Sequence, residues 1–480
     1  MVLICCIDVV VVGVLFLLAV QGGIERALPF ASFVIVLVPF ESRLEAGLFI
    51  LTTQRLVVVT LAALSVAFPG NFKEFSNRKG APLKWLMGFS VLWCLVSALN
   101  SIVPAISFKN LLSLVLDYYL LYFVCWRAFL HTNTIHRVFR GIVAALGISS
   151  VLGAVEVYRH WSVKSLFPPV THLFDMGGNL LNVDLERGLR VTSTFGHPIL
   201  FGLALAVGIT LDIYLLTITE TLKGKILLWL AILPMFLNIY KTGSRGPWIG
   251  CSMAMAILFL LGEPKAKKLV VTIGIITVAV LLIRPGIWET FRGIYANSFR
   301  AETSTGSSYE YRYALTDAVV KAVDKNVPRM MWGYGMGSDY DLNLQGTIWG
   351  VSKTFLSVDS TWLSMLVGVG YVGLGIFLAL FSKPALLAWK DYWRQPKPGR
   401  YLSLVLLTCL VTYYFVMVGV ALFDQNWYML WILIAATVVC GRLKPTEAQP
   451  AGVASKAPPT HIRPIETDVG DPVLLNRGRG

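Results

Sequence analysis

Long runs of apolar residues, separated by short polar segments, recur along the whole chain. A helix needs about 20 consecutive apolar residues to cross a hydrocarbon core of about 30 Å. The run at 28–40 is short, so a re-entrant segment is an alternative there and the orientation of the N-terminus stays open. The pattern predicts twelve or thirteen transmembrane helices, at 2–20, 28–40, 48–67, 84–103, 106–129, 140–158, 196–218, 226–240, 247–262, 268–287, 359–382, 401–421 and 425–441.

The composition excludes an ordinary soluble domain. Of the 480 residues, 56% are hydrophobic and 14% are charged, whereas soluble domains carry about 25% charged residues. We therefore predict an all-α polytopic membrane protein. The seven cysteines all fall inside predicted spans without paired spacing, and the six histidines form no zinc motif. Since a Walker motif is also absent from the sequence, we predict neither a metal nor a cofactor.

Positive charge is concentrated in alternate loops, which sets the expected orientation. The net charge is +14, and Lys and Arg are in excess at 71–84, 262–268 and 383–400. Basic loops favour the cytoplasmic side of a membrane. Membrane topology therefore explains the positive net charge, and we predict no nucleic-acid partner. The segment 288–358 carries seven basic and seven acidic residues, so we predict that it is a large outer loop. The segment 161–194 and the turn around Arg245 then lie outside as well.

The same pattern divides the chain into two regions. Residues 1–443 form the predicted transmembrane domain, which includes the outer loop at 288–358. Residues 444–480 are rich in proline, alanine and charge and lack an apolar period. Such a segment cannot bury enough apolar surface to fold. We therefore predict a disordered cytoplasmic tail.

The outer loop is predicted to contain an amphipathic helix. Its apolar face consists of Tyr311, Leu315, Ala318, Val319 and Ala322. We expect this helix to lie at the membrane interface and to end at Pro328. Glycines follow at 333, 335 and 337; they suit a tight loop close to a ligand, although glycines are ordinary in any loop.

Two arginines stand just outside predicted helices on the outer side. Arg190 precedes the helix that begins near Pro198, and Arg245 precedes Pro247 in the same way. Unpaired N–H groups at a helix N-terminus attract anions, and guanidinium binds phosphate oxygens in pairs. The two arginines are therefore candidates for a diphosphate clamp. The alternative is that each reaches lipid headgroups.

Acidic residues provide the other candidates for chemistry. Asp359, at the start of the span 359–382, can cap that helix or act as a general base towards a sugar hydroxyl. The triplet Asp339-Tyr340-Asp341 has the spacing of a divalent-cation motif, although any acidic loop produces it often. Asp8 and Asp117 lie inside predicted spans, which indicates either a functional or a packing role.

Three stretches, in this order, resemble the superfamily of O-antigen ligases and Wzy-type polymerases, which are bacterial membrane proteins. They are RVTSTFGHP with Arg190, GSRGPW with Arg245, and NVPRMMWGYGMGS followed by the glycine-rich span that VDSTW opens. The resemblance covers roughly residues 180 to 380. It implies a GT-C-like glycosyltransferase of the bacterial inner membrane, with its site on the periplasmic face.

The resemblance also implies partners and residue roles. The donor is expected to be an undecaprenyl-diphosphate-linked oligosaccharide in the lipid bilayer, and a chain-length regulator and a flippase of the same pathway are expected partners. Arg190 and Arg245 would hold the diphosphate and stabilise its charge as the glycosidic bond breaks, with Asp359 as the base. Further substrate contacts are expected at Lys241, Ser244, Arg312, Tyr334 and His197.

One departure separates the possible activities. Ligases that attach O-antigen to lipid A-core generally have a histidine just before the span where this chain has Asp359, and no histidine occurs between Trp288 and Thr361. We therefore predict a polymerase that extends a polysaccharide, with a ligase as the alternative. A transporter or flippase for lipid-linked sugar is a third hypothesis, because Asp8 and Asp117 would also suit one.

Overall fold

The computed structural model describes residues 2–46, 49–68, 80–167, 181–184, 188–283, 304–348, 350–396 and 399–443, with a few isolated positions between 286 and 296. The chain divides into two units, Met1–Pro445 and Thr446–Gly480, and all described residues belong to the first. The predicted tail, 444–480, lies outside the described residues. Most of 71–84 and parts of 161–194 and 288–358 lie outside them too.

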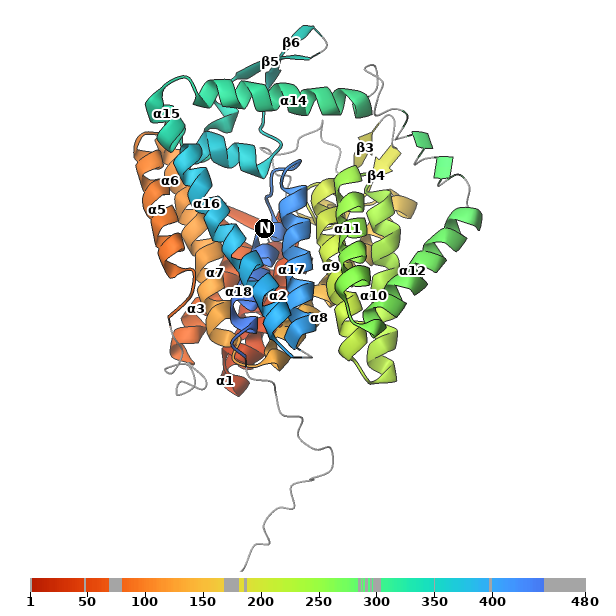
Figure 1. Cartoon of the computed structure of the whole chain (residues 1–480). Helices are drawn as coiled ribbons and strands as arrows, with labels where there is room; N and C mark the ends of the chain where they lie inside the picture. The colour runs from red at the N-terminus through yellow and green to blue at the C-terminus, as the bar shows by residue number, and fades with distance from the viewer. Residues whose placement is uncertain are drawn as a thin grey trace, which may run out of the picture. The chain divides into compact units, whose positions relative to one another are not determined.

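Helices dominate the described residues (Figure 1), and every predicted span contains one. The helices before Arg190 are α1 (Val2–Gly22), α2 (Ile24–Leu37), α3 (Thr53–Ala67), α5 (Lys84–Leu99), α6 (Pro104–Ser113), the π-helix η1 (Leu114–Tyr119), α7 (Leu120–Ala128), α8 (Thr132–Arg159) and the 3₁₀ turn η2 (Val163–Leu166). Those after it are α9 (Pro198–Ile218), α10 (Leu222–Lys241), α11 (Arg245–Leu261), α12 (Pro264–Ile283), α14 (Ser304–Val323), α15 (Val327–Trp332), the 3₁₀ turn η3 (Ser338–Tyr340), α16 (Thr361–Arg394), α17 (Gly399–Val416) and α18 (Gln425–Cys440).

The prediction of an all-α polytopic membrane protein is confirmed. Among the described residues, seven helices are long and apolar enough to cross a membrane, and four more are apolar but shorter. The predicted spans at 48–67 and 84–103 are among the shorter ones, because a polar residue precedes the first residue of one helix and follows the last residue of the other. Thr52 caps α3, where its side chain accepts a hydrogen bond from the Arg55 N–H, and Asn100 follows the last residue of α5.

Three antiparallel hairpins in the described part of the chain interrupt the helices, and the apolar pattern did not predict them. They are β1 (Arg43–Ala46) with β2 (Phe49–Thr52), β3 (Asn182–Asp184) with β4 (Gly188–Arg190), and β5 (Leu344–Ile348) with β6 (Val351–Phe355). Each is too short to give a recognisable alternation. The first corrects the predicted span 48–67, whose opening residues are a strand. The second fixes Arg190 opposite Asn182.

The basic segments meet at one end of the helix bundle. The ammonium of Lys383, on α16, donates to the Pro82 carbonyl at 3.3 Å. Further along the same helix, the Tyr392 hydroxyl donates to the Leu261 carbonyl, the last residue of α11, at 2.9 Å. Helix α14 and the β5–β6 hairpin lie at the opposite end (Figure 1). The loops that charge assigns to different sides are thus separated by the length of the bundle.

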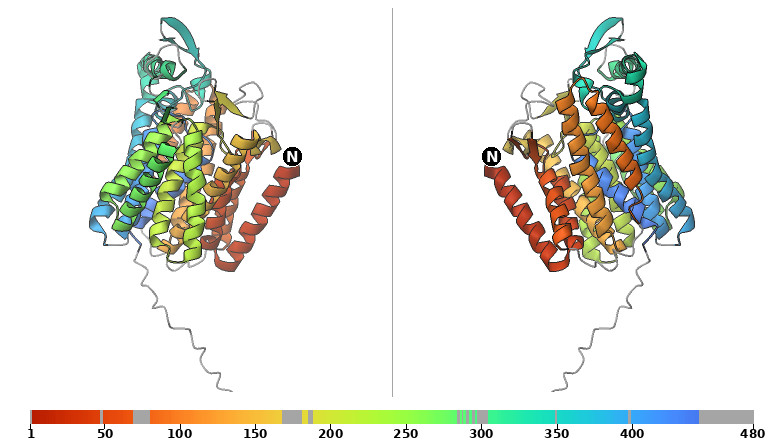
Figure 2. Two further views of the ribbon diagram at one scale, coloured as in Figure 1. Left: turned by 90° about the vertical axis from the view of Figure 1, so that its right-hand side faces the viewer. Right: turned by 90° about the vertical axis from the view of Figure 1, so that its left-hand side faces the viewer.

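Helix α14 lies across this opposite end, as the views in Figures 1 and 2 show. Its apolar face is buried against protein: Leu315 and Val319 pack with Phe355 of β6 and Leu366 of α16. This face therefore contacts protein, and the position of the helix at the membrane interface stays a prediction. The expected end at Pro328 is wrong. The helix ends at Val323, and Pro328 stands instead in the first turn of α15, where a missing N–H has no cost.

Helix α16 is broken near its start, at Gly370, where φ is 68°. A Cβ there would lie 2.3 Å from the Met331 carbonyl oxygen, so only glycine fits. Hydrogen bonds from other segments satisfy the carbonyls before the break. The Gly335 N–H donates to the Gly368 carbonyl at 2.9 Å, and the Trp93 ring N–H donates to the Val369 carbonyl at 3.0 Å. A break in a membrane helix requires such internal partners.

Candidate functional site

A pocket of about 1500 Å³ lies where the first turns of α9, α11 and α16 meet α14 and the loop after α17. Its charged and polar lining includes Asp184, Arg190, His197, Ser244, Arg245, Arg312, Asp339, Ser357, Asp359 and Ser364. Its aromatic lining includes Phe377, Phe381, Trp427 and Trp431. A mostly apolar cavity with a few convergent polar groups is the usual form of a ligand site.

Six of the eight predicted site residues line this pocket, and two do not. The six are Arg190, His197, Ser244, Arg245, Arg312 and Asp359. Lys241 ends α10 outside the lining, and its carbonyl accepts a hydrogen bond from the Val191 N–H. The Tyr334 hydroxyl donates to the Ala322 carbonyl at 2.7 Å. Lys241 and Tyr334 are thus expected to contribute to the site only through the segments they support.

The guanidinium of Arg190 bridges the two arginine segments. Its Nε donates to the Thr242 carbonyl at 3.1 Å, and its Nη2 donates to the Ser244 hydroxyl at 2.8 Å. Arg190 is 9% exposed, so these contacts fix it in a place of low solvent access. They also join the turn that bears Arg245 to the strand that bears Arg190.

Close packing of α9 on α11 brings the same two segments together. A Cβ on Gly202 would lie 2.8 Å from the Pro247 ring, so the helices meet at a contact that only glycine permits. Arg245 is the first residue of α11. The N–H groups of a first turn have no partner within the helix, and Gly246 in that turn lines the pocket. The N-terminus of α11 therefore adds its positive dipole end to the arginines.

A buried carboxylate holds the segment between Arg190 and His197. Glu156, on α8, accepts hydrogen bonds from the N–H of Thr192 at 3.1 Å and of Ser193 at 2.7 Å, and from the Thr192 hydroxyl at 3.2 Å. These residues belong to no helix, so their buried N–H groups need acceptors elsewhere. The polar run of the RVTSTFGHP stretch thus has a local structural reason.

Two further buried ionisable side chains support this segment. The Lys164 ammonium, after α8, donates to the Thr192 hydroxyl at 2.7 Å and to the Phe195 carbonyl at 3.3 Å. Asp424 caps α18 and accepts from the Gly196 N–H at 3.2 Å. Burial raises the pKa of Asp424 to about 7, against the lowering effect of hydrogen bonds from Asn426 and Gly196.

Sequence reasoning missed Glu156, Lys164 and Asp424. Each nevertheless carries a signal: Glu156 lies inside a predicted span, Lys164 lies on the predicted outer side against the charge bias, and Asp424 stands in a short gap between two predicted spans. Buried charges in membrane proteins usually have a partner and a role. Here the role is to fix the backbone between two residues that line the pocket.

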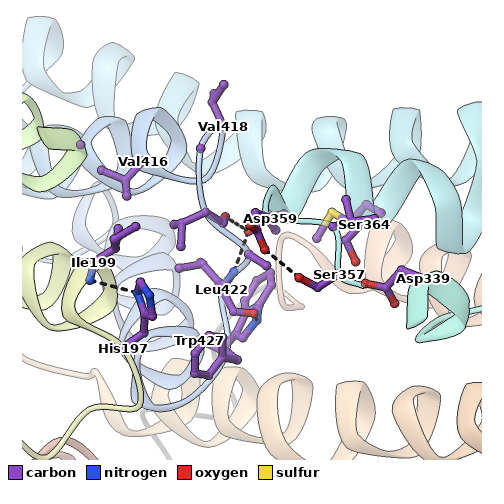
Figure 3. A pocket seen from close by; sticks show the side chains of 18 of the residues that line it. His197, Ile199, Asp339, Ser357, Asp359, Ser364, Val416, Val418, Leu422 and Trp427 are labelled. Carbon is purple, nitrogen blue, oxygen red and sulfur yellow. Dashed lines mark hydrogen bonds between the residues drawn. The ribbon is translucent and has the colours of Figure 1, made fainter. Parts of the chain in front are cut away.

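His197 is neutral at ordinary pH. Its Nδ1 accepts a hydrogen bond from the Ile199 N–H at 3.2 Å, which caps α9 (Figure 3). Burial, together with the positive charges of Arg190 and Lys164, lowers the pKa of His197 to about 3. A histidine with so low a pKa is a weak base. It contributes a neutral ring to the pocket.

Asp359 is not the cap of α16. That role belongs to Ser360, whose hydroxyl accepts from the Leu363 N–H at 3.4 Å. The Asp359 side chain is exposed and lines the pocket, and its Oδ1 accepts from the Ser357 hydroxyl at 2.9 Å (Figure 3). Burial and the neighbouring Asp359 carboxylate raise the pKa of Tyr311 to about 12, so this phenol stays protonated beside it.

The Asp339-Tyr340-Asp341 triplet is split by its conformation. Asp339 is buried and lines the pocket, whereas Asp341 is exposed and does not. Within the residues that the structure describes, no group of three or more His, Cys, Asp or Glu side chains is placed to hold a metal ion. The alternative of a divalent cation held by both aspartates therefore has no geometric support.

Arg312 reaches the pocket from α14. Its Nη2 donates to the Gly419 carbonyl, in the loop after α17, at 3.3 Å. This contact ties the helix of the outer loop to the wall opposite it. Arg312 and Asp359 thus enter the pocket from the segment predicted as the outer loop and from its junction with α16.

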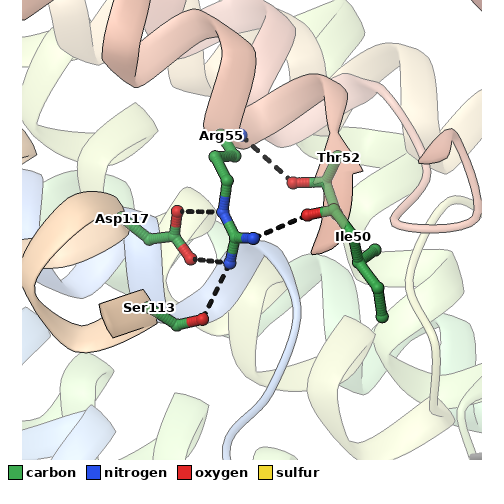
Figure 4. Close-up of polar contacts among 5 residues, drawn as sticks. All are labelled: Ile50, Thr52, Arg55, Ser113 and Asp117. Atoms are coloured by element: carbon green, nitrogen blue, oxygen red, sulfur yellow. Dashed lines mark hydrogen bonds and ion pairs between the residues drawn. The ribbon is translucent and has the colours of Figure 1, made fainter. Parts of the chain in front are cut away.

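The intramembrane aspartates Asp8 and Asp117 have partners within the bundle. The Asp117 carboxylate accepts from Arg55 through both oxygens, at 2.8 and 2.7 Å (Figure 4). Asp8 accepts from the Thr53 hydroxyl at 2.8 Å. These contacts give both residues a packing role, and the observation that motivated a transporter is accounted for.

Comparison with known proteins agrees with this geometry. Residues 230–378 match a family model described as O-antigen ligase. The matched range includes Arg245, Arg312 and Asp359, whereas Arg190 and His197 precede it. No curated protein matches the chain. The family implies a membrane glycosyltransferase-like enzyme of the O-antigen ligase or polymerase type. Residues 230–378 are thus similar to the O-antigen ligase family, which agrees with the predicted resemblance to the superfamily of O-antigen ligases and Wzy-type polymerases.

Proposed function

We propose that this chain is a polysaccharide polymerase of the bacterial inner membrane. It transfers glycan from an undecaprenyl-diphosphate-linked donor to a sugar hydroxyl of a lipid-linked acceptor repeat unit on the periplasmic face. One observation carries the proposal: Arg190, Arg245 and Asp359 come from three separate segments and line one pocket. Two cations and a carboxylate in one cavity suit the transfer of a sugar away from a diphosphate.

The arginines act on the leaving group. Arg190 is fixed by the Thr242 carbonyl and the Ser244 hydroxyl, and Arg245 stands at the N-terminus of α11. Guanidinium groups and a helix N-terminus both stabilise phosphate charge. Because this charge grows as the glycosidic bond breaks, donors placed in advance lower the barrier more than they strengthen ground-state binding.

Asp359 acts on the acceptor. Its carboxylate takes the proton of the acceptor hydroxyl while the oxygen forms a bond to the anomeric carbon. The bond from that carbon to the phosphate oxygen breaks, and its electron pair leaves with the diphosphate. Attack from the face opposite the leaving group inverts the anomeric configuration. His197 is a poor alternative base, since its pKa is lowered to about 3.

A ligase is the second candidate, because the matching family is described as O-antigen ligase. It shares the donor site and differs in its acceptor, which is lipid A-core or another molecule. The sequence has no histidine between Trp288 and Thr361, and the pocket histidine, His197, comes from another segment. Asp359 then remains as the base, which favours the polymerase.

Deletion of the gene separates the two activities. A polymerase mutant accumulates single lipid-linked repeat units, and a ligase mutant accumulates lipid-linked polymer. Complementation with Arg245→Ala or Arg190→Ala should restore no polymer although protein level and membrane insertion persist. Arg159→Ala is the matched control, since Arg159 is exposed at the end of α8 and does not line the pocket. Wild-type polymer from both pocket variants would refute the proposal.

A further inference from the structure

Polar side chains line the pocket along one membrane helix to which the proposed function gives no role. Asn110 of α6, Ser113 at the end of α6 and Tyr118 of η1 all line it. They belong to the segment Pro104–Ala128, which is long and apolar enough to cross a membrane. Polar side chains within such a segment usually face protein or a cavity that holds a ligand. This wall of the pocket therefore suits a hydrophilic part of a substrate.

A π-helical turn, η1, separates the side chains that follow Ser113. It covers Leu114–Tyr119, where Tyr118 lines the pocket, whereas Asp117 is buried and does not line it. Arg55 of α3 donates to both oxygens of Asp117, at 2.8 and 2.7 Å (Figure 4). Turns of this kind are rare and are frequent at functional sites. The turn thus holds Arg55 behind the pocket wall while other side chains of the same helix face the pocket.

One hydrogen bond of the Arg55 guanidinium reaches Ser113. Its Nη2 donates to the Ser113 oxygen at 2.8 Å, and its contacts with Asp117 and the Ile50 carbonyl fix the plane of the group (Figure 4). A guanidinium has donors only, so the Ser113 oxygen accepts here and its own proton remains to be donated. Within the part of the chain that the structure describes, no protein group accepts that proton. Ser113 thus offers the pocket a hydroxyl donor that a cation holds and polarises.

The wall that bears Ser113 adjoins the segment that leads to Asp359. The Asn110 amide, on α6, donates to the Met336 carbonyl at 3.1 Å. A Cβ on Gly337 would lie 2.4 Å from the same amide nitrogen, so this loop packs closely on α6. The loop leads into η3, which packs against α16, and Asp359 stands just before that helix. Ser113 therefore belongs to the part of the pocket where the proposed base lies.

We infer that Ser113 donates a hydrogen bond to an oxygen of the acceptor sugar, and that Arg55 is the positioning residue that orients this hydroxyl. The inference rests on the proposed function, because that function places the acceptor beside Asp359. The hydroxyl and ring oxygens of a sugar are suitable partners for a lone O–H donor. A contact that is made equally before and during the reaction changes KM and leaves kcat unchanged.

The test uses the full chain in vesicles. The donor is the labelled lipid-linked repeat unit extracted from a strain that lacks the gene. The acceptor is the same oligosaccharide as an alkyl glycoside, which has no diphosphate and cannot act as a donor. Transfer of label to the glycoside is measured while one of the two concentrations is varied, so that each substrate has its own KM. The melting temperature of each variant in detergent shows whether it folds.

The variants separate a contact with the ligand from support of the fold. Ser113→Ala removes the hydroxyl, and Ser113→Thr keeps it. Ser65→Ala is the matched control, because Ser65 is a buried serine of α3 that donates to the Ala62 carbonyl and does not line the pocket. Arg55→Lys is made alone and together with Ser113→Ala, with Arg55→Gln in its place if the lysine variant does not insert.

We expect Ser113→Ala to raise the KM for the glycoside about fivefold to tenfold, the usual effect of losing one hydrogen bond. The KM for the donor and kcat should stay within about twofold of the wild type. Ser113→Thr and Ser65→Ala should keep the KM for the glycoside within about threefold. The Arg55 variant should raise this KM in the wild type but by less than about twofold once Ser113 is alanine, because it acts through that hydroxyl.

Three results would overturn the inference. A KM for the glycoside in Ser113→Ala within about twofold of the wild type removes the contact. A rise in the KM for the donor alone places the hydroxyl at the donor instead. An equal effect of the Arg55 variant with and without the hydroxyl leaves Arg55 a structural residue only. Failure of the wild type to transfer label to any acceptor contradicts the proposed polymerase itself.

Discussion

The bridge made by Arg190 gives the sharpest test of the donor site. Its Nε and Nη2 donate to the Thr242 carbonyl and the Ser244 hydroxyl at 3.1 and 2.8 Å. The guanidinium is thus oriented before the donor binds, so little side-chain entropy is lost on binding. Removing one preorganised donor from a site of developing charge costs about 3–4 kcal/mol, or a factor of about 10² to 10³ in rate.

A graded series of variants follows from these contacts. We expect Arg190→Ala to lower the rate about 10³-fold. Arg190→Lys should lower it about 10²-fold, because an ammonium keeps the charge but cannot span both anchors and the phosphate. Ser244→Ala keeps the guanidinium and removes one hydrogen bond to it, which is worth about 1–1.5 kcal/mol and a five- to tenfold loss.

Initial rates of polymer formation from extracted lipid-linked repeat units, by purified protein in vesicles, measure this series. Arg159→Ala controls for loss of an exposed arginine at the same end of the bundle. The melting temperature of each variant in detergent shows whether it folds. Wild-type rates for Arg190→Lys, or a Ser244→Ala variant slower than Arg190→Ala, would show that orientation of this guanidinium does not set the rate.

Three further predictions concern the scaffold of the site. Glu156→Gln should lower stability by about 1–3 kcal/mol, because the amide NH₂ group replaces one oxygen that accepts a hydrogen bond, and a buried backbone N–H then has no acceptor. An unchanged melting temperature would argue against this network. For Asp424, the pKa rises on folding to about 7; the folded state therefore holds a proton that the unfolded state has lost, and stability falls as pH rises from about 4 to about 7, by up to about 4 kcal/mol. Asp424→Asn should flatten melting temperature across that range, and a curve as steep as that of the wild type would contradict the assignment. Gly370→Ala should destabilise the fold by more than about 2 kcal/mol, because φ is 68° and a Cβ would lie 2.3 Å from the Met331 carbonyl; Gly375→Ala, with nothing within 4 Å, is the control on the same helix.

The sequence by itself determined the membrane architecture and most of the candidate site. Apolar runs long enough to cross a bilayer have few alternatives to helix, because every backbone polar group in lipid must be satisfied within the segment. Arg190 and Arg245 were recognisable because they stand on the predicted outer side against the charge bias, each beside a predicted helix start. Asp359 was recognisable in the same way, as an acid at the start of a span.

Only the tertiary structure decided how these segments meet. The contact of Gly202 with Pro247 brings the two arginine segments together. The break at Gly370 allows the loop that contains Gly333 and Gly335 to pack on α16. Both depend on close approach between segments far apart in the chain, which no local pattern encodes. The apolar face of α14 is equally suited to lipid and to protein by its sequence, and its burial on β6 and α16 reflects the surface available in the fold. The same holds for Asp339: its spacing from Asp341 suggested a shared cation, but the turn at η3 points one carboxylate into the pocket and leaves the other exposed.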